Sequence, residues 1–289
     1  MKTNRRDFIR NSALLTAGAL VLPSLKASPG MYSATAMKPG LQVYSVRKQL
    51  LEDFEGTMKY ISEVGYTYLE GYGLGTDGLF LGKYTAKEYN NVITDLGMEL
   101  KSTHCSYAKA EDAGAMIDAA ASTGAEYLIV PSTPGNLRKT LDDWKAVAEN
   151  YNKLGELCKK AGMRFGYHNH TFEFKAIDGI LPMEFLIAST DKDLVFFEAD
   201  LFWVTRAGYD PLRLLKQFPG RIFLFHVKDA NADLEPATVG KGIIDFKSIF
   251  EIARADSLHY YFVEDERLDN PFKNIKDDYN YVSAQPYMN

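Results

Sequence analysis

The chain has 289 residues, of which 46% are hydrophobic and 25% are charged, a composition typical of a folded globular protein. Its net charge is −5, and residues 1–36 hold five basic side chains and one acidic one, so the remaining 253 residues carry −9. Such an acidic body repels polyanions, which excludes a nucleic-acid partner. The two cysteines, Cys105 and Cys158, are too few for a disulfide scaffold and form no CxxC motif.

The first 36 residues predict a targeting segment rather than part of the fold. Arg5 and Arg6 precede a short apolar run over residues 13–22, and Ala34-Thr-Ala36 is a candidate cleavage site, with Leu25-Lys-Ala27 as the alternative. The apolar run is too short for an ordinary membrane span, so we expect no stable membrane insertion of the mature chain. The segment resembles a twin-arginine export signal, which implies an exported, periplasmic protein. Buried positions are expected for both thiols, because an exposed thiol would oxidise outside the cytosol.

Residues 37–289 predict one domain in which strands and helices alternate. The expected strands cover residues 41–45, 66–72, 98–107, 127–131, 164–170, 194–200, 222–228 and 260–265. The expected helices cover residues 54–64, 87–96, 110–123, 141–161, 182–189, 211–218, 246–255 and 271–282, several of them followed by a glycine stop. Eight strand–helix units in about 250 residues predict a single (β/α)₈ TIM barrel of the α/β class. A doubly wound open sheet is the second choice, but it requires a Gly-rich phosphate turn that the glycines between 71 and 75 do not match.

Polar side chains concentrate at the carboxyl ends of the expected strands, where the active sites of such barrels lie. Four of the five histidines are found there, namely His104, His168, His170 and His226, whereas His259 begins a strand and is expected to be structural. Strand residues two apart share a face, which groups His168 with His170, Glu198 with Asp200, His226 with Lys228, and Glu264 with Glu266.

Histidine and carboxylate side chains from four successive strands can therefore converge on one point. Such a mixed nitrogen and oxygen donor set suits Mn²⁺, Zn²⁺, Co²⁺ or Fe²⁺ better than Mg²⁺. A buried cluster of charges also needs a counter-ion, so the sequence predicts one divalent metal ion.

Four motifs then carry a specific resemblance. They are Gly166-Tyr-His-Asn-His170, Glu198-Ala-Asp-Leu-Phe-Trp203, the segment from Gly220 to Asp229, and Phe262-Val-Glu-Asp265. With residues 41–45 and 239–245, they resemble the sugar phosphate isomerase/epimerase family of xylose-isomerase-like TIM barrels.

That resemblance implies one metal ion held by side chains of the fifth to eighth strands. Asp200, His226 and Glu264 match the last three ligands of the family, and His168 stands where the epimerases carry a glutamate. In those enzymes that glutamate is one of two opposed acid/base groups, so its replacement puts a simple two-carboxylate epimerisation in doubt.

The expected reaction begins with removal of a proton next to a carbonyl group and passes through an enediolate. Glu264, His170 and His104 are candidate bases, and Lys228 is a candidate for holding a substrate oxygen or for a structural ion pair. The candidate substrate-binding residues are Tyr44, Glu70, Trp203 and Glu198, where Glu70 and Glu198 can equally act behind the ligands.

The sequence predicts an exported, metal-dependent sugar isomerase or epimerase acting on a free or oxidised small-molecule carbohydrate. The main alternative is a lyase that eliminates from a 3-keto-glycoside, because both reactions begin with the same proton removal. A noncatalytic sugar-binding protein is a further alternative, and a homo-oligomer is compatible with the sequence. An endonuclease of the related apurinic-site family is disfavoured, because it needs more metal ligands and a basic groove.

Overall fold

The computed structural model describes residues 37–289, so the expected targeting segment lies outside the described residues. Eight parallel strands close into a barrel in the order β1-β10-β7-β6-β5-β4-β3-β2. Their bounds are β1 Gly40–Gln42, β2 Tyr68–Leu74, β3 Glu99–Cys105, β4 Tyr127–Val130, β5 Arg164–His168, β6 Val195–Asp200, β7 Ile222–Val227 and β10 Tyr260–Val263. This closed barrel confirms the predicted fold class and excludes the open sheet.

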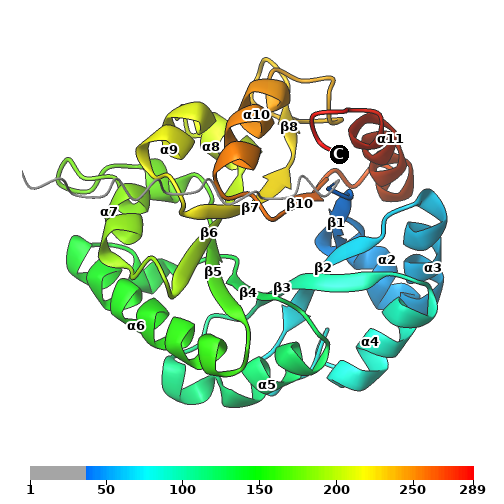
Figure 1. The fold of residues 1–289 in the computed structure, drawn as a ribbon, viewed down its shortest axis with the longest axis horizontal. Coiled ribbons are helices and arrows are strands. Elements are labelled where there is room, and N and C mark those ends of the chain that lie inside the picture. The colour runs from blue at the N-terminus through cyan, green and yellow to red at the C-terminus, as the bar shows by residue number, and fades with distance from the viewer. Residues whose placement is uncertain (1–36) are drawn as a thin grey trace, which may run out of the picture. The chain divides into compact units, whose positions relative to one another are not determined.

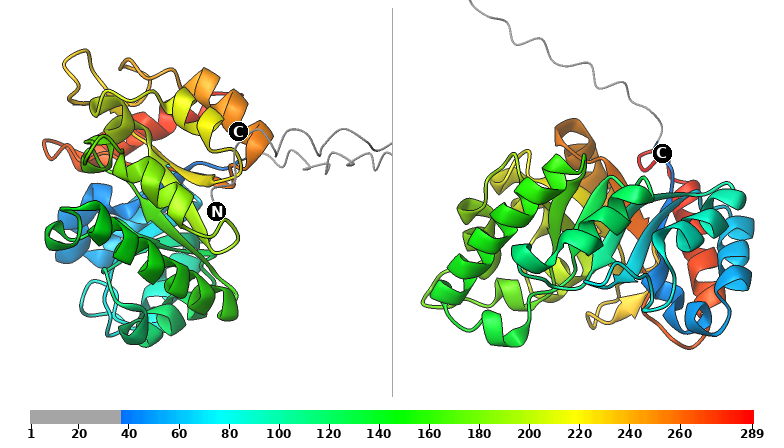
Figure 2. Two further views of the ribbon diagram at one scale, coloured as in Figure 1. Left: turned by 90° about the vertical axis from the view of Figure 1, so that its left-hand side faces the viewer. Right: turned by 90° about the horizontal axis from the view of Figure 1, so that it is seen from below.

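Helices surround the strands on the outside (Figures 1 and 2). The longer ones are α3 Phe54–Val64, α4 Ala86–Asp95, α5 Gly114–Ser122, α6 Leu141–Lys160, α7 Pro182–Ser189, α9 Pro211–Gln217, α10 Phe246–Asp256 and α11 Pro271–Ser283. Two short helices, α2 Arg47–Glu52 and α8 Leu201–Arg206, and a small hairpin of β8 Asp229–Ala230 with β9 Pro236–Ala237 were not expected from the sequence. No helix within residues 37–289 is both long and apolar enough to cross a membrane.

Helix α6 illustrates how the sequence specifies these elements. Thr140 caps its first turn by accepting a hydrogen bond from the N–H of Asp143, whose carboxylate accepts the N–H of Thr140 in return. Its buried side chains recur every three or four residues from Trp144 to Cys158, which turns one face to the barrel. Gly155 lies on that face, where a Cβ atom would come within 2.5 Å of the carbonyl oxygen of Leu194.

Several expected elements have other bounds in the structure, and three of them show how the chain sets those bounds. The first strand stops at Gln42, because the Gln42 side chain accepts the N–H of Tyr44 and starts the 3₁₀ turn Val43–Val46. The fifth strand stops at His168 and not at His170, whose N–H donates to the side chain of Glu173 at 2.9 Å. The helix expected over 110–123 is divided into a short turn, Ala110–Asp112, and α5.

A small apolar layer fills the barrel interior beneath the polar strand ends. It consists of Tyr127, Ile129, Leu224 and Phe262, all buried. Leu224 and Phe262 precede His226 and Glu264 by two residues, so the interior changes from apolar to polar within one pleat. Gly166 lies beside this layer, and a Cβ atom there would come within 2.6 Å of the Ile129 side chain.

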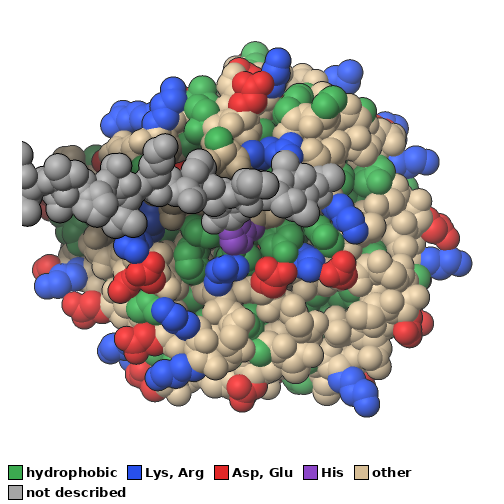
Figure 3. Space-filling model, viewed as in Figure 1, with side chains coloured by type: hydrophobic (Ala, Val, Ile, Leu, Met, Phe, Trp, Pro, Cys, Tyr) green, Lys and Arg blue, Asp and Glu red, His purple; other side chains and the backbone are tan. Residues whose placement is uncertain are grey.

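The surface charges, the two cysteines and His259 are placed as the sequence predicts. On the face drawn in Figure 3, acidic and basic side chains are interspersed in the part that the grey atoms leave visible. Cys105 and Cys158 are both buried and unpaired, as expected. His259 lies at the amino end of β10, where Nδ1 is 2.6 Å from the hydroxyl of Tyr127, in agreement with a structural role.

Candidate metal centre and cavity

A cavity of about 460 Å³ opens at the carboxyl ends of the strands. Its lining includes the predicted residues Tyr44, His104, His168, His170, Trp203 and Glu264, together with Tyr72, Tyr107 and Glu266. Glu70 and Glu198 do not line this cavity; both side chains are fully buried behind it. Neither carboxylate reaches the cavity lining, which agrees with the other role expected of them, a position behind the ligands.

Four of the buried residues form one compact set, which we call the Asp200 group: His168, Asp200, His226 and Glu264. These are the four ligands predicted from the sequence, and one donor atom of each lies within 4.8 Å of the others. Nε2 of His168 is 3.5 Å and Nδ1 of His226 is 3.7 Å from Oδ2 of Asp200, and Nδ1 of His226 is 3.3 Å from Oε2 of Glu264. Neighbouring ligands of an ion bound at 2.0–2.3 Å are themselves roughly 3 to 3.7 Å apart, so these spacings fit a metal ion.

Two polar atoms of the Asp200 group lack the hydrogen bonds that buried atoms normally make. Among residues 37–289, Nε2 of His168 and Oδ2 of Asp200 are buried and have no hydrogen-bond partner. The opposite ring nitrogen of His168 is 3.2 Å from the carbonyl oxygen of Pro131, an acceptor, which leaves the lone pair on Nε2. The donor chemistry therefore fits a divalent ion that prefers mixed imidazole and carboxylate ligands.

Local structure fixes the carboxylate of Asp200. This residue ends β6 and caps α8, because its Oδ1 accepts the N–H of Trp203 at 2.8 Å. The cap leaves Oδ2 facing the other ligands. Burial alone would raise the pKa of Asp200, but His226 and the positive charge of Lys228 outweigh it and hold the pKa well below its usual range.

The carboxylate of Glu264 is held ionised in a similar way. Burial raises its pKa, but the positive charges of Lys228 and His226 dominate and lower it. The Nζ atom of Lys228 is 3.7 Å from Oε2 of Glu264 and donates a 2.6 Å hydrogen bond to Glu266. The same ammonium lies 4.6 Å from the ring centre of Trp203. These contacts allow a lysine that is 1% exposed to remain charged.

His170 lies on the wall of the cavity in a stack of rings. Its imidazole packs between Phe172, at 5.7 Å between centroids, and Trp203, at 5.5 Å. Burial and the neighbouring His168 lower the pKa of His170 to about 3, so the ring is neutral. The carboxylate of Glu173 positions this segment by accepting the N–H of His170 and the hydroxyl of Tyr167.

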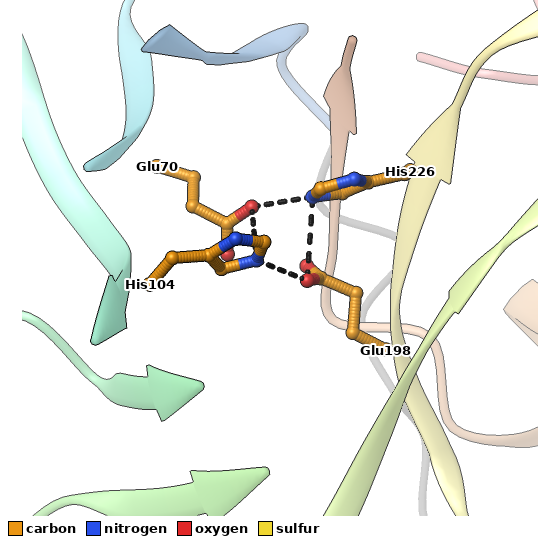
Figure 4. A group of neighbouring side chains, drawn as sticks. All are labelled: Glu70, His104, Glu198 and His226. Atoms are coloured by element: carbon orange, nitrogen blue, oxygen red, sulfur yellow. Dashed lines mark hydrogen bonds and ion pairs between the residues drawn. The ribbon is translucent and has the colours of Figure 1, made fainter. Parts of the chain in front are cut away.

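Behind the Asp200 group lies a second buried set, the Glu70 group, formed by Glu70, His104 and Glu198 with Nε2 of His226 (Figure 4). Nε2 of His104 is 2.8 Å from Glu198, so that nitrogen of this candidate base is already engaged. Burial raises the pKa of Glu70, but His104 and His226 outweigh it and lower the pKa to about 2. Burial and the charge of Glu70 raise the pKa of Glu198 well above its usual range.

Several residues around the two sets were not singled out in the sequence. They are Gln42, Ser102, Tyr107 and Glu173. Gln42 and Ser102 are single polar residues that belong to no recognisable motif. Their contact with Glu70 exists only because three strands lie side by side in the barrel. No pattern in the sequence distinguishes them from ordinary strand residues.

Comparisons with known proteins identify the class. Residues 58–283 match the family model described as the xylose isomerase-like TIM barrel, and the chain belongs to this family. It is similar to a sugar phosphate isomerase/epimerase from Parabacteroides distasonis, with 29% identity, a TM-score of 0.80, and coverage of 91% of this chain and 99% of the other. A second such protein from the same strain is 27% identical, with a TM-score of 0.75 and coverage of 87% and 100%.

Among proteins compared by sequence, an inosose dehydratase from Clostridium beijerinckii is 29% identical over 154 residues. That match covers 46% of this chain and 51% of the dehydratase. The chain thus matches about half the length of the dehydratases to which it is similar. The family contains enzymes, and both isomerase/epimerase and dehydratase names occur among the similar proteins.

Proposed function

We propose that this chain is a divalent-metal-dependent enzyme that removes the α-proton of a polyhydroxylated ketone and then expels an oxygen substituent from the β-carbon. A divalent ion, when bound by the Asp200 group, withdraws electron density from a carbonyl oxygen and so acidifies the neighbouring C–H. The similarity to inosose dehydratases, whose name denotes loss of water, supports elimination as the outcome.

The observation that carries this proposal is the placement of Glu264 beside Lys228. The two follow the neighbouring strands β10 and β7, and their charged atoms are 3.7 Å apart. Glu264 lines the cavity as a proton acceptor, and Lys228 lies directly behind the lining, where it donates a hydrogen bond to the lining residue Glu266. Elimination needs both, because one carbon loses a proton while the leaving oxygen must gain one.

The residues account for every proton in this reaction. A carboxylate oxygen of Glu264 takes the α-proton, and the electrons of the broken C–H bond form the new carbon–carbon double bond. The C–O bond breaks with its electron pair, and the departing oxygen gains a proton from Lys228 through Glu266, which lines the cavity and accepts the 2.6 Å hydrogen bond of the ammonium. Glu264 then returns its proton to Lys228, once the two side chains close their present 3.7 Å separation to hydrogen-bond distance, and this restores the starting state.

Isomerisation or epimerisation is the second candidate, because the structure from Parabacteroides distasonis resembles this chain over nearly its whole length. Epimerisation needs a second group that exchanges a proton on the opposite face of the substrate. His170 is the candidate, since it follows β5, three strands around the barrel from β10, and lines the cavity. A neutral ring can accept a proton, but the wall opposite Glu264 offers no second carboxylate within the described residues that line the cavity.

The cavity favours an unphosphorylated carbohydrate. Its lining within residues 37–289 includes two carboxylates, Glu264 and Glu266, and neither lysine nor arginine. A phosphate group would meet these negative charges without a partner. Tyr44, Tyr72 and Trp203 supply aromatic faces that suit the C–H surfaces of a sugar ring.

Incubation in D₂O tests both candidates. The Mn²⁺-loaded protein is mixed with an inosose, a keto-glycoside or a ketose, and products are followed by NMR and by absorbance of the unsaturated ketone. Elimination predicts an unsaturated ketone and loss of the leaving group, whereas deuterium in a rearranged sugar indicates the isomerase or epimerase. Binding without exchange or product across the panel would contradict both and favour a noncatalytic sugar-binding protein.

A further inference from the structure

The Glu70 group is bonded differently from the Asp200 group, although both sets consist of histidine and carboxylate. In Figure 4 the polar atoms of Glu70, His104, Glu198 and His226 face one another around a closed ring. Nε2 of His226 is 2.5 Å from Oε2 of Glu70, and Nε2 of His104 is 2.8 Å from Oε2 of Glu198. These two are hydrogen-bond distances, shorter than the roughly 3 to 3.7 Å expected between two ligands of one ion. The other two sides of the ring, from Nε2 of His104 to Glu70 and from Nε2 of His226 to Glu198, are 3.3 Å each.

The other contacts of Glu70 support the same assignment. Gln42 donates to Oε2 at 2.8 Å, and the hydroxyl of Ser102 donates to Oε1 at 2.5 Å. With His226, three donors surround a carboxylate that is 0% exposed. Such a carboxylate is fully used as an acceptor, whereas Oδ2 of Asp200 has no donor among the described residues.

We propose that Glu70 is a positioning residue that selects the ring nitrogen through which His226 binds metal. Burial alone would lower the pKa of His226, but the surrounding carboxylates raise it, so metal binding has to displace one proton from its imidazolium, which leaves a neutral ring with one N–H and one lone pair. Glu70 accepts the N–H on Nε2, so the lone pair lies on Nδ1, which faces Asp200 at 3.7 Å and Glu264 at 3.3 Å. This inference rests on the proposed metal-dependent function.

A consequence is that the two sets together hold one divalent ion rather than two. His226 belongs to both sets, and its single lone pair serves only one of them. The Glu70 group then keeps its hydrogen bonds through Oε2 of Glu70 and Oε2 of Glu198, which hold His226 and His104 in place, while Oε1 of Glu198 is buried without a partner in the described residues. A second ion in the Glu70 group would require the neutral ring of His226 to lose its one remaining N–H proton as well.

The test is the variant Glu70→Gln, which keeps the size of the side chain but places an amide N–H₂ among three donors. One of those donors loses its acceptor, and His226 can then turn its lone pair towards the amide. We expect Zn²⁺ to bind at least ~10-fold more weakly than to the wild type, as measured by calorimetry. Glu126→Gln is the matched control, since Glu126 accepts hydrogen bonds from Tyr260 and Lys101 at the other end of the barrel.

A measurement on the wild type makes the test independent of how the variant folds. In protein labelled with ¹⁵N-histidine and loaded with Zn²⁺, two-bond ¹⁵N–¹H spectra should show His226 coordinated through Nδ1 and protonated at Nε2. Coordination through Nε2, two Zn²⁺ ions per chain, or an unchanged affinity in Glu70→Gln would overturn the inference. Absence of Zn²⁺ binding by the wild type would instead contradict the proposed function itself.

Discussion

Nε2 of His168 and Oδ2 of Asp200 face each other across 3.5 Å, and neither atom has a hydrogen-bond partner in the described part of the chain. Two buried atoms that both present lone pairs repel each other, and each has lost its hydration. A cation between them removes both penalties. This relationship distinguishes the Asp200 group from an ordinary buried hydrogen-bond network.

Removing the charge of Asp200 should therefore weaken metal binding without unfolding the protein. In Asp200→Asn the amide oxygen can still cap α8, while the negative ligand is lost. We expect the affinity for Mn²⁺ or Zn²⁺ to fall by at least ~10-fold in calorimetry. Asp210→Asn is the control, because Asp210 caps α9 by accepting the N–H of Leu212 and lies outside the cavity. Equal metal affinities for the two variants would contradict the ligand assignment.

Glu264 should be required for proton removal. The variant Glu264→Gln keeps the size of the side chain and some ability to coordinate, but it loses basicity. Turnover should fall by at least ~10², with a smaller change in substrate binding. Exposed Glu251 on α10 gives the matched variant Glu251→Gln, which should retain wild-type kinetics. Wild-type turnover in Glu264→Gln would remove it as the base.

Replacing Lys228 should separate removal of the α-proton from loss of the leaving group. Lys228→Met keeps much of the apolar stem against Trp203 but has no proton to donate. We expect formation of the unsaturated ketone to fall by ~10² or more, while α-proton exchange with D₂O continues. Loss of exchange and elimination to the same extent would show that Lys228 acts before the leaving group departs.

The buried carboxyl of Glu173 predicts a pH dependence of stability. Burial raises its pKa to about 7 in the folded protein, above the ordinary value of 4.5 that applies when the chain unfolds. The folded state therefore binds this proton more tightly, and the resulting stabilisation is complete below pH 4.5 and is lost as the pH rises towards 7. The expected loss is about 3 kcal/mol, since each unit of pKa corresponds to about 1.4 kcal/mol.

Urea unfolding of the wild type and of Glu173→Gln between pH 4.5 and 7.5 measures this effect. Glutamine does not titrate, so the difference between the two free energies of unfolding should change by about the same 3 kcal/mol over that window. A difference that stays constant with pH would show that Glu173 has an ordinary pKa.

Residues 1–36 predict a periplasmic location, and we propose that the protein is exported through the twin-arginine route. Replacing Arg5 and Arg6 with lysine should leave precursor in the cytoplasm, as fractionation and immunoblotting would show. Arg10→Lys is the matched control, because it lies outside the arginine pair. Normal export of the double variant would indicate the general secretory route.

Local patterns in the sequence were sufficient for most of the fold. Glycine stops located the ends of several helices, as at Gly65, where φ is +116° and α3 ends. The (β/α)₈ barrel followed from the alternation of elements, and the period of two along strands brought Asp200, His226 and Glu264 to one face. Short elements such as α2 and α8 were missed, because six residues carry too little periodicity.

What the sequence could not provide is the network around Glu70. Its contacts with His226 join residues 156 positions apart, and those with Ser102 and Gln42 depend on the register of β1, β2 and β3. The position of His170 could not be predicted from the alternation of residues along a strand either. Strand β5 ends at His168, and the backbone N–H of His170 donates to the Glu173 side chain instead of to a neighbouring strand. Both features result from closure of the barrel rather than from local preference.

Closure also sets the order in which the site can assemble during synthesis. The last strand, β10, lies between β1 and β7. Its residue Phe262 pairs with Gly40 of β1 on one side and with His226 of β7 on the other. Glu264, one of the four candidate ligands, follows this strand directly. A nascent chain that has not reached β10 therefore has an open barrel and an incomplete ligand set, so metal uptake has to wait until almost the whole barrel has left the ribosome.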